Sequence, residues 1–232
     1  MDSPESDALA AQVHELVELV DSLADADHTR PSRCPGWAVA ELVAHCEGML
    51  VRLVGANAEP YPGPPAIDRV GYYRYDPDGP REGEDPSVTF SEVIRDRVID
   101  EVAGRGPAEL RHALRNAAHA ALTGIELVPA DRVIKRSGHP SMTFGEFVAS
   151  RNLEFGVHTL DIAHACGRPE KVNAASAKIT VEILDGLLGA PVPDAVGWSA
   201  VEYILAGTGR IPLTTEDRRR LGASAEKFPL LR

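Results

Sequence analysis

The residues best placed to do chemistry lie in the segment SRNLEFGVHTLDIAHACG, at 150–167. Arg151, Glu154, His158 and Asp161 are spaced so that a helix would place all four on one face. A carboxylate and an imidazole at i and i+4 can reach a common point, as metal-binding helices require. The same spacing also fits a simple salt-bridging pair on a solvated face, and the motif alone does not decide between the two.

A further metal ligand must come from another element, and His45 is the best candidate. On a helical wheel at ~100° per residue, it lies at the edge of the apolar stripe of its own segment. An edge position lets the imidazole point into a pocket between helices without entering a fully apolar core. Two imidazoles and one carboxylate leave positions open for water or substrate, which is typical of catalytic sites. His45, Glu154 and His158 are therefore a candidate site for one divalent metal ion, and the alternative, a salt-bridging Glu154/His158 pair with a surface histidine at position 45, stays open at this point.

The elements that must position these ligands are helices. Apolar periodicity and end signals predict them at 4–26, 38–56, 87–123 with an interruption near 104–107, 143–166, 173–188, 198–206 and 215–221. Ser3, Thr143 (in a capping box with Glu146) and Asn173 are expected helix caps, and 127–142 reads as a turn or short hairpin. We predict an all-α protein: a four-helix bundle over 1–190, with a short helical C-terminal extension, 191–232, packed on it.

The stretch 57–86, rich in proline and glycine, is an exception to the helical pattern. A structureless segment this long inside a compact domain is either disordered or functional. It carries tyrosines and arginines that suit a lid over a site: Tyr61, Tyr72, Tyr73, Tyr75, Arg69, Arg74 and Arg81. We leave both interpretations, an ordered lid and disorder, open.

The composition of the chain excludes some classes of binding partner and some cellular locations. The chain has 232 residues and a formal net charge of -11, which argues against binding the phosphate backbone of nucleic acid. No window approaches the roughly 20 apolar residues of a membrane span, and the acidic N-terminus does not resemble a secretory signal. Three cysteines without CxxC spacing fit a reducing compartment. We therefore expect a cytoplasmic protein.

Two segments carry a resemblance to a known family. SRCPGWAVAELVAHCEGM, at 32–49, resembles the signature of the mycothiol-dependent maleylpyruvate isomerase family, whose metal-binding domain belongs to the DinB/YfiT-like four-helix-bundle superfamily. RNLEFGVHTLDIAHACGRP, at 151–169, is similar to that family's second signature, and the two follow in the expected order. The resemblance covers roughly 5–190, and the Thr-Gly-Arg at 208–210 is similar to a family tail.

The resemblance implies that His45, Glu154 and His158 are the metal ligands. It implies zinc as the metal, and nickel, iron, cobalt or manganese also suit these donors. Asp161 is then either an outer partner that orients an imidazole or a surface carboxylate. Arg151 either pairs with Glu154, meets an anionic substrate or is a surface charge. Catalytic residues and residues that bind the thiol are not assigned.

The implied function is that of a metal-dependent enzyme with mycothiol as cosubstrate and a small electrophilic metabolite as substrate. The resembled isomerases have a C-terminal sterol-carrier-like domain that contributes a catalytic arginine, whereas about 40 residues follow Leu188 here. We therefore expect S-transfer or conjugation more than thiol-assisted isomerisation. Two alternatives remain: a thiol-independent metal-dependent hydrolase or lyase, and a non-catalytic metal-binding module.

We expect the other titratable residues to have structural rather than catalytic or metal-binding roles. Cys46, at the centre of an apolar stripe, is expected to be a buried and inert thiol. His164 falls on another face from His158, and His112 and His119 are expected to be solvated or satisfied in the core. The apolar helix at 173–188 is a candidate interface for a homodimer.

Overall fold

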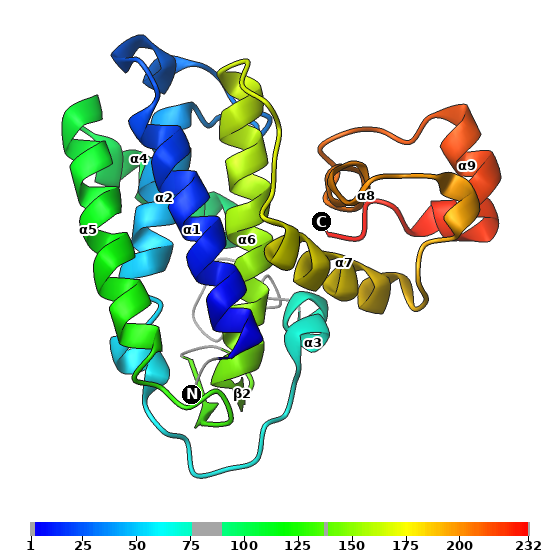
Figure 1. The fold of residues 1–232 in the computed structure, drawn as a ribbon, viewed down its shortest axis with the longest axis horizontal. Helices are drawn as coiled ribbons and strands as arrows, with labels where there is room; N and C mark the ends of the chain where they lie inside the picture. Colours follow the sequence, from blue (N-terminus) through cyan, green and yellow to red (C-terminus); the bar gives the residue numbers. More distant parts are fainter. Residues whose placement is uncertain (1–2, 76–89, 137–138, 232) are drawn as a thin grey trace.

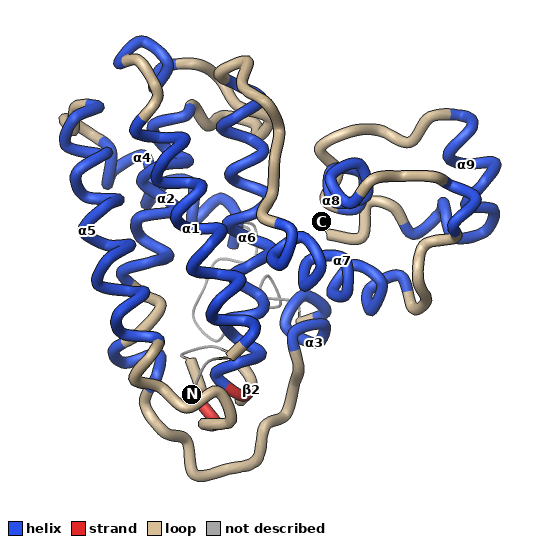
Figure 2. The backbone as a smooth tube through the Cα atoms, in the orientation of Figure 1, coloured by secondary structure: helices blue, strands red, loops and turns tan. Residues whose placement is uncertain are grey.

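The computed structural model describes residues 3–75, 90–136 and 139–231, and these residues are mainly helical (Figures 1 and 2). The α-helices are α1 (Pro4–Asp21), α2 (Val39–Val51), α3 (Arg69–Arg74), α4 (Phe90–Val102), α5 (Pro107–Ile125), α6 (Phe144–Ala165), α7 (Ala174–Leu188), α8 (Ala200–Gly207) and α9 (Thr215–Leu221). Two short strands, β1 (Val133–Ile134) and β2 (Met142–Thr143), pair antiparallel as the expected hairpin. No helix among these residues is long and apolar enough to cross a membrane. The all-α prediction is confirmed.

Four helices, α1, α2, α5 and α6, lie side by side as the bundle (Figure 1). Their facing apolar side chains form one continuous core, which includes Leu9, Leu16, Leu42, Leu50 and Leu114. Each of these leucines is almost completely buried, and burying such a side chain contributes about 1.5–3 kcal/mol. The stripes that predicted the helices are therefore the faces that pack against one another.

The central element of the bundle is α6, which is buried around nearly its whole circumference. It packs against α1 on one side, against α7 on another and against α2 on a third. Its polar residues are therefore inside the protein, where each needs a partner. Thr159, for example, accepts a hydrogen bond from Gln12 at 3.0 Å and donates to the carbonyl of Phe155.

The observed helix ends match the predicted ends where a side chain caps the helix, and they differ from the prediction elsewhere. Thr143 and Asn173 cap α6 and α7 as predicted. Ser3 occupies the N-cap position of α1 as predicted, but its hydroxyl donates to Glu5 at 2.7 Å and does not accept from a backbone amide of the helix. The second helix ends at Val51 rather than at residue 56: Arg52 leaves the helical conformation as its C-cap, and residues Gly55–Ala58 form a separate 3-10 helix. The interruption of the third helical region, between α4 and α5, is confirmed.

The segment predicted to be a lid or disordered contains a short helix, α3. Asp68 caps it by accepting from the amides of Val70 and Gly71. Arg69 then fastens it to the bundle with ion pairs of 2.9 Å to Glu5 of α1 and Glu146 of α6. Residues 57–75 are therefore ordered against the bundle, whereas the rest of the predicted loop, 76–86, lies outside the described residues.

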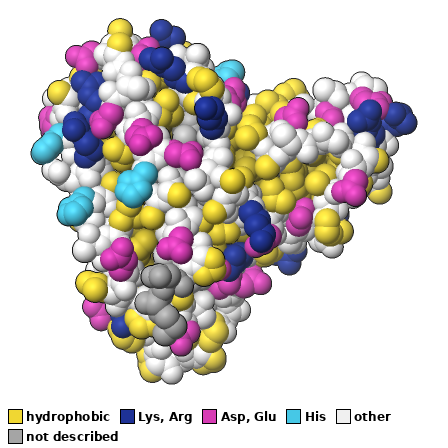
Figure 3. Space-filling view, viewed as in Figure 1, with side chains coloured by type: hydrophobic (Ala, Val, Ile, Leu, Met, Phe, Trp, Pro, Cys, Tyr) yellow, Lys and Arg dark blue, Asp and Glu magenta, His cyan; other side chains and the backbone are white. Residues whose placement is uncertain are grey.

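The chain leaves the bundle through α7, which crosses α6 and α1 and leads into the C-terminal helices (Figure 1). Hydrophobic side chains gather where these helices meet the bundle (Figure 3). Trp198 stacks on Tyr203 and donates to Asp217 at 2.9 Å, which ties α8 to α9. After α8 the chain turns back, and Arg210 reaches α6.

Candidate metal centre

The structure brings the three predicted metal ligands together. His45 comes from α2, and Glu154 and His158 come from α6. One donor atom of each lies within 4.8 Å of the donors of the other two. The imidazoles of His45 and His158 meet edge to face, with ring centroids 5.0 Å apart, and His158 Nε2 lies 3.8 Å from Glu154 Oε2. Two helices that are distant in the chain thus direct their donors at one point.

The turn before α2 fixes the direction of His45. The backbone amide of Ala38 donates to the carboxylate of Glu41 at 2.8 Å, which begins the helix without a side-chain cap at position 38. Trp37, from the same turn, packs against the core and lies edge-on to the ring of His45, with centroids 5.2 Å apart. His45 is therefore held between the rings of Trp37 and His158.

The hydrogen bonding and charge state of the His45 ring fit a metal ligand. Its Nδ1 atom is buried and has no hydrogen-bond partner among the described residues. Burial, and then the positive charges of His158 and nearby arginines, hold the pKa of His45 well below its ordinary value, so the ring is neutral. A neutral imidazole with a free nitrogen is the form that binds a divalent ion. Two imidazoles and one carboxylate are donors of the type that zinc and other first-row metals accept.

His158 is held on its other side by Asp161. Its Nδ1 atom lies 3.4 Å from Asp161 Oδ2, an electrostatic contact without hydrogen-bond geometry. Burial alone would lower the pKa of His158, but Asp161 and Cys34 raise it to about 9 in the metal-free protein. Burial would likewise raise the pKa of Asp161, but His158 and Arg210 lower it to about 2. The pair is therefore an imidazolium next to a carboxylate when no metal is bound.

A second set of possible ligands, Cys34, His158 and Asp161, lies on the far side of the same ring. Arg210 already supplies a positive charge there. Its Nη2 atom lies 3.1 Å from Asp161 Oδ2 and 3.6 Å from Cys34 Sγ, and the Cys34 thiol donates to Asp161 at 3.4 Å. A metal ion at this position would be repelled by the guanidinium. The electrostatics therefore favour His45, Glu154 and His158.

Glu154 is fixed by two other residues. The hydroxyl of Tyr73, on α3, donates to Glu154 Oε1 at 3.2 Å and to the carbonyl of Ser150 at 2.7 Å. Arg151 Nη2 lies 3.9 Å from Glu154 Oε1. The segment expected to be either a lid or disordered thus contributes a side chain to the centre.

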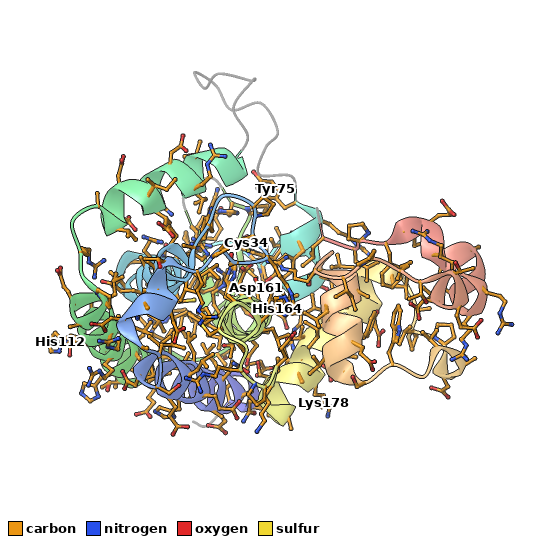
Figure 4. All side chains as sticks on the ribbon, turned by 90° about the horizontal axis from the view of Figure 1, so that it is seen from above. Cys34, Tyr75, His112, Asp161, His164 and Lys178 are labelled. Carbon is orange, nitrogen blue, oxygen red and sulfur yellow. The ribbon has the colours of Figure 1, made fainter. Side chains whose placement is uncertain are left out.

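Burial excludes the surface interpretations of these residues. Asp161 is completely buried and Arg151 is 6% exposed, so neither is a surface charge. For the same reason Glu154 and His158 do not form a pair on a solvated face. Of the other histidines, His112 and His119 are exposed, and His112 lies at the outer edge of the bundle, far from Cys34 and Asp161 (Figure 4). His164 is also exposed and contacts Glu170 at 2.9 Å.

Three residues at the centre were not assigned to it from the sequence: Cys34, Tyr73 and Arg210. Cys34 is one of three cysteines without metal-site spacing, and Tyr73 is one of several tyrosines in a proline-rich stretch. Only the similarity of the segment 208–210 to a family tail drew attention to Arg210. None of the three has a spacing relationship with the ligands, because each arrives from a different element. Cys46, in contrast, is buried as predicted, and burial raises the pKa of its thiol.

Comparisons with known proteins agree with this architecture. The family model described as the mycothiol maleylpyruvate isomerase N-terminal domain matches residues 9–163, a span that contains His45, Glu154 and His158. Two solved structures of the mycothiol-dependent maleylpyruvate isomerase, one of them a histidine-to-alanine mutant, each superpose with a TM-score of 0.54 and 12% sequence identity. Each alignment covers 83% of this chain and 70% of the other. At that identity the likeness establishes a common fold. A search of curated proteins found no match.

Proposed function

We propose, from the premise that this chain belongs to the mycothiol maleylpyruvate isomerase N-terminal domain family, that it is a metal-dependent enzyme with mycothiol as cosubstrate. Its reaction is S-transfer or conjugation of the thiol to a small electrophilic metabolite, or thiol-assisted isomerisation of that metabolite. The observation that carries the proposal is the convergence of one donor atom each from His45, Glu154 and His158 within 4.8 Å.

The metal ion that best fits these donors is zinc, with nickel, iron, cobalt or manganese as alternatives. When bound, such an ion would supply the positive charge that lets a thiol lose its proton near neutral pH. Three protein ligands leave room for the thiol, whereas a purely structural site would need a fourth protein donor.

The surrounding residues hold the ligands in place. Asp161 orients the ring of His158 through Nδ1, and Arg210 holds Asp161 in turn. Tyr73 donates to one oxygen of Glu154, which leaves the other oxygen, Oε2, on the side of His158. The centre is partly enclosed: His158 and Asp161 are buried and Trp37 lies edge-on to His45, while the Glu154 side chain is 25% exposed.

The reaction needs no further reactant. Addition of a thiol to an activated double bond forms one sulfur–carbon bond and moves the thiol proton to the neighbouring carbon. If the adduct is released, the product is a conjugate. If the carbon–carbon single bond rotates and the thiol is then eliminated, the double bond returns as the other isomer and the thiol is regenerated. Displacement is the third case, in which the leaving group departs with its electron pair.

The proposal is tested by metal content together with thiol dependence. Protein grown in zinc- and nickel-supplemented medium should contain about one divalent ion per chain, as a single three-ligand site implies. The His45→Ala and His158→Ala variants should lose the ion, and the exposed control His112→Ala should keep it. Mycothiol should bind the wild type and should be required for turnover of maleylpyruvate, followed by both isomer and conjugate formation. Equal absence of metal in all four proteins, or turnover without the thiol, would overturn the proposal.

A further inference from the structure

Four arginines act electrostatically on one another or on His45 beside the candidate metal centre, and we call them the arginine cluster: Arg52, Arg97, Arg136 and Arg151. They come from the end of α2, from α4, from the segment after β1 and from α6, respectively. This gathering of positive charge is unexpected in a chain with a net charge of -11. In the proposed mechanism above, none of the four has a role in holding the metal.

Aromatic rings fix two members of the arginine cluster in adjacent positions. The guanidinium groups of Arg136 and Arg151 both lie over the ring of Phe147, at 4.8 Å and 5.1 Å from its centroid. Tyr72 contacts both as well: its ring lies 5.0 Å from the Arg151 guanidinium, and its hydroxyl accepts from Arg136 Nη1 at 3.1 Å. Rings hold guanidinium planes without neutralising their charge.

Among the described residues, the arginine cluster has no carboxylate as close as those that Arg69 and Arg105 have. Three of its nitrogen atoms, Arg97 Nε, Arg136 Nε and Arg151 Nη2, are buried without a hydrogen-bond partner among the described residues. The nearest ion pairs are long, at 3.7 Å from Arg97 to Glu101 and 3.9 Å from Arg151 to Glu154. Orphaned donors of this kind are costly inside a protein unless something accepts from them.

Ordinary arginines of this protein are paired closely. Arg69 reaches two carboxylates at 2.9 Å, and Arg105 reaches Glu47 at 2.8 Å. In the arginine cluster, burial and then the neighbouring Arg97 lower the pKa of Arg52, and burial and Arg151 contribute to a lowered pKa of Arg136. Arg52 is therefore repelled by Arg97, and Arg136 by Arg151, whereas Tyr72 and Glu154 raise the pKa of Arg151 despite its burial. A bound anion would relieve the repulsion.

We propose that the arginine cluster is an anion site that binds a carboxylate group of the electrophilic substrate. This inference rests on the proposed function, which supplies the assumption that the bound anion is a substrate of the enzyme. A carboxylate is the matching anion because two of its oxygens accept from the edges of guanidinium groups held in fixed planes.

The position of the site relative to the metal ligands supports this assignment. Arg151 lies one helical turn before Glu154, and its Nη1 atom contacts Met49 Sδ at 3.9 Å, one turn after His45. A carboxylate bound there would hold the rest of a small molecule next to the metal ligands. The other arginine of the centre, Arg210, is already engaged by Asp161. Beside the candidate metal centre, the arginine cluster is therefore the group whose positive charge is still available to bind an anion.

The test is direct binding of a carboxylate to the full-length protein as purified, with metal content measured on the same samples. The probes are succinate, neutral succinamide and inorganic phosphate, titrated by calorimetry. We expect succinate to bind, succinamide not to bind, and phosphate to bind more weakly than succinate. Arg97→Gln, which changes a side chain that is 40% exposed, and Arg136→Gln should each weaken succinate binding about tenfold or more, the loss expected for a hydrogen bond to a charged group. The control Arg105→Gln should bind as the wild type does.

The outcomes separate this inference from the proposed function. If Arg97→Gln and Arg136→Gln bind succinate as the wild type does, or if phosphate binds more tightly than succinate, the carboxylate site is refuted whatever the metal content. If the protein contains no metal but succinate binds in an arginine-dependent way, the anion site stands and the proposed enzyme mechanism fails. His45→Ala should lose the metal and still bind succinate.

Discussion

Arg210 Nη2 lies 3.1 Å from Asp161 Oδ2, although 49 residues separate the two along the chain. The contact joins the segment after α8 to the middle of α6, next to His158. It places a fixed positive charge behind His158, one of the proposed metal ligands. The C-terminal segment is therefore part of the environment of the candidate centre.

Asp161→Asn should weaken metal binding and destabilise the fold. An amide in place of the carboxylate removes the charge that orients His158, and changes of this kind cost roughly 10–100-fold in metal affinity. It also leaves Arg210 without its buried counterion, which should lower the free energy of unfolding by about 3 kcal/mol. Competition with a metal chelator and urea unfolding measure the two effects.

The matched control is Glu170→Gln. Glu170 also contacts a histidine and an arginine, the exposed His164 at 2.9 Å and Arg33 at 2.8 Å, but Glu170 is partly exposed whereas Asp161 is completely buried. A carboxylate that keeps contact with water contributes less than a fully buried one, so this variant should lose less stability than Asp161→Asn and keep its metal affinity. Similar losses in both variants would contradict the role assigned to Asp161.

Metal affinity should rise with pH. In the metal-free protein Asp161 and Cys34 raise the pKa of His158 to about 9, so this ring carries a proton at neutral pH, which a metal ion must displace. His45 is neutral over the same range and adds no proton. The apparent affinity for zinc should therefore increase about tenfold per pH unit between pH 6 and 8, and level off above about 9. A zinc affinity that does not change between pH 6 and 8 would show that His158 is not a ligand.

His28 should make the fold more sensitive to acid. Burial and then Arg111 lower its pKa below the ordinary value of 6.5, so the folded protein resists protonating it. The unfolded chain takes up this proton as the pH falls through 6.5, and the free energy of unfolding should fall from there downward. In His28→Gln this contribution is absent, so the difference in stability between pH 7.5 and pH 5.5 should shrink.

Urea unfolding at the two pH values measures the effect of His28. The control is His112→Gln, which replaces an exposed histidine and should leave the pH dependence close to that of the wild type. A loss of stability on acidification that is equal in wild type and His28→Gln would contradict the prediction.

Gly186→Ala should loosen α3 from α7. A Cβ atom at Gly186 would overlap the side chain of Val70, whose branched form restricts its rotamers. We expect a loss of about 1–3 kcal/mol in the free energy of unfolding, the usual cost of overpacking. Because α3 carries Tyr73 to Glu154, the metal affinity should also fall. The double variant Gly186→Ala with Val70→Ala removes the overlap, so it should be more stable than the sum of the two single changes predicts. If the stability changes of the two single variants simply add in the double variant, the loss does not come from overlap between position 186 and Val70.

The sequence by itself determined the helices and most of their caps. Apolar stripes such as Leu9 to Val20 and Leu42 to Leu50 predict the buried faces because helix geometry is local, and Thr143 and Asn173 cap the residues that follow them. The i, i+4 spacing of Glu154 and His158 likewise follows from the period of one helix. His45 could be joined to that pair only through the family resemblance.

The tertiary structure alone decided which polar residues are buried. In a simple four-helix bundle the outer face of α6 would meet solvent, but here α7 covers it, and the segment after α8 reaches Asp161. The spacing of Asp161 and Arg151 in the sequence therefore fits a surface position and a buried position equally well. Only the packing of the folded chain shows that both are buried. Periodicity describes one helix, whereas the surroundings of Asp161 depend on Cys34 and Arg210, which lie far away in the chain. No local pattern encodes where such residues meet.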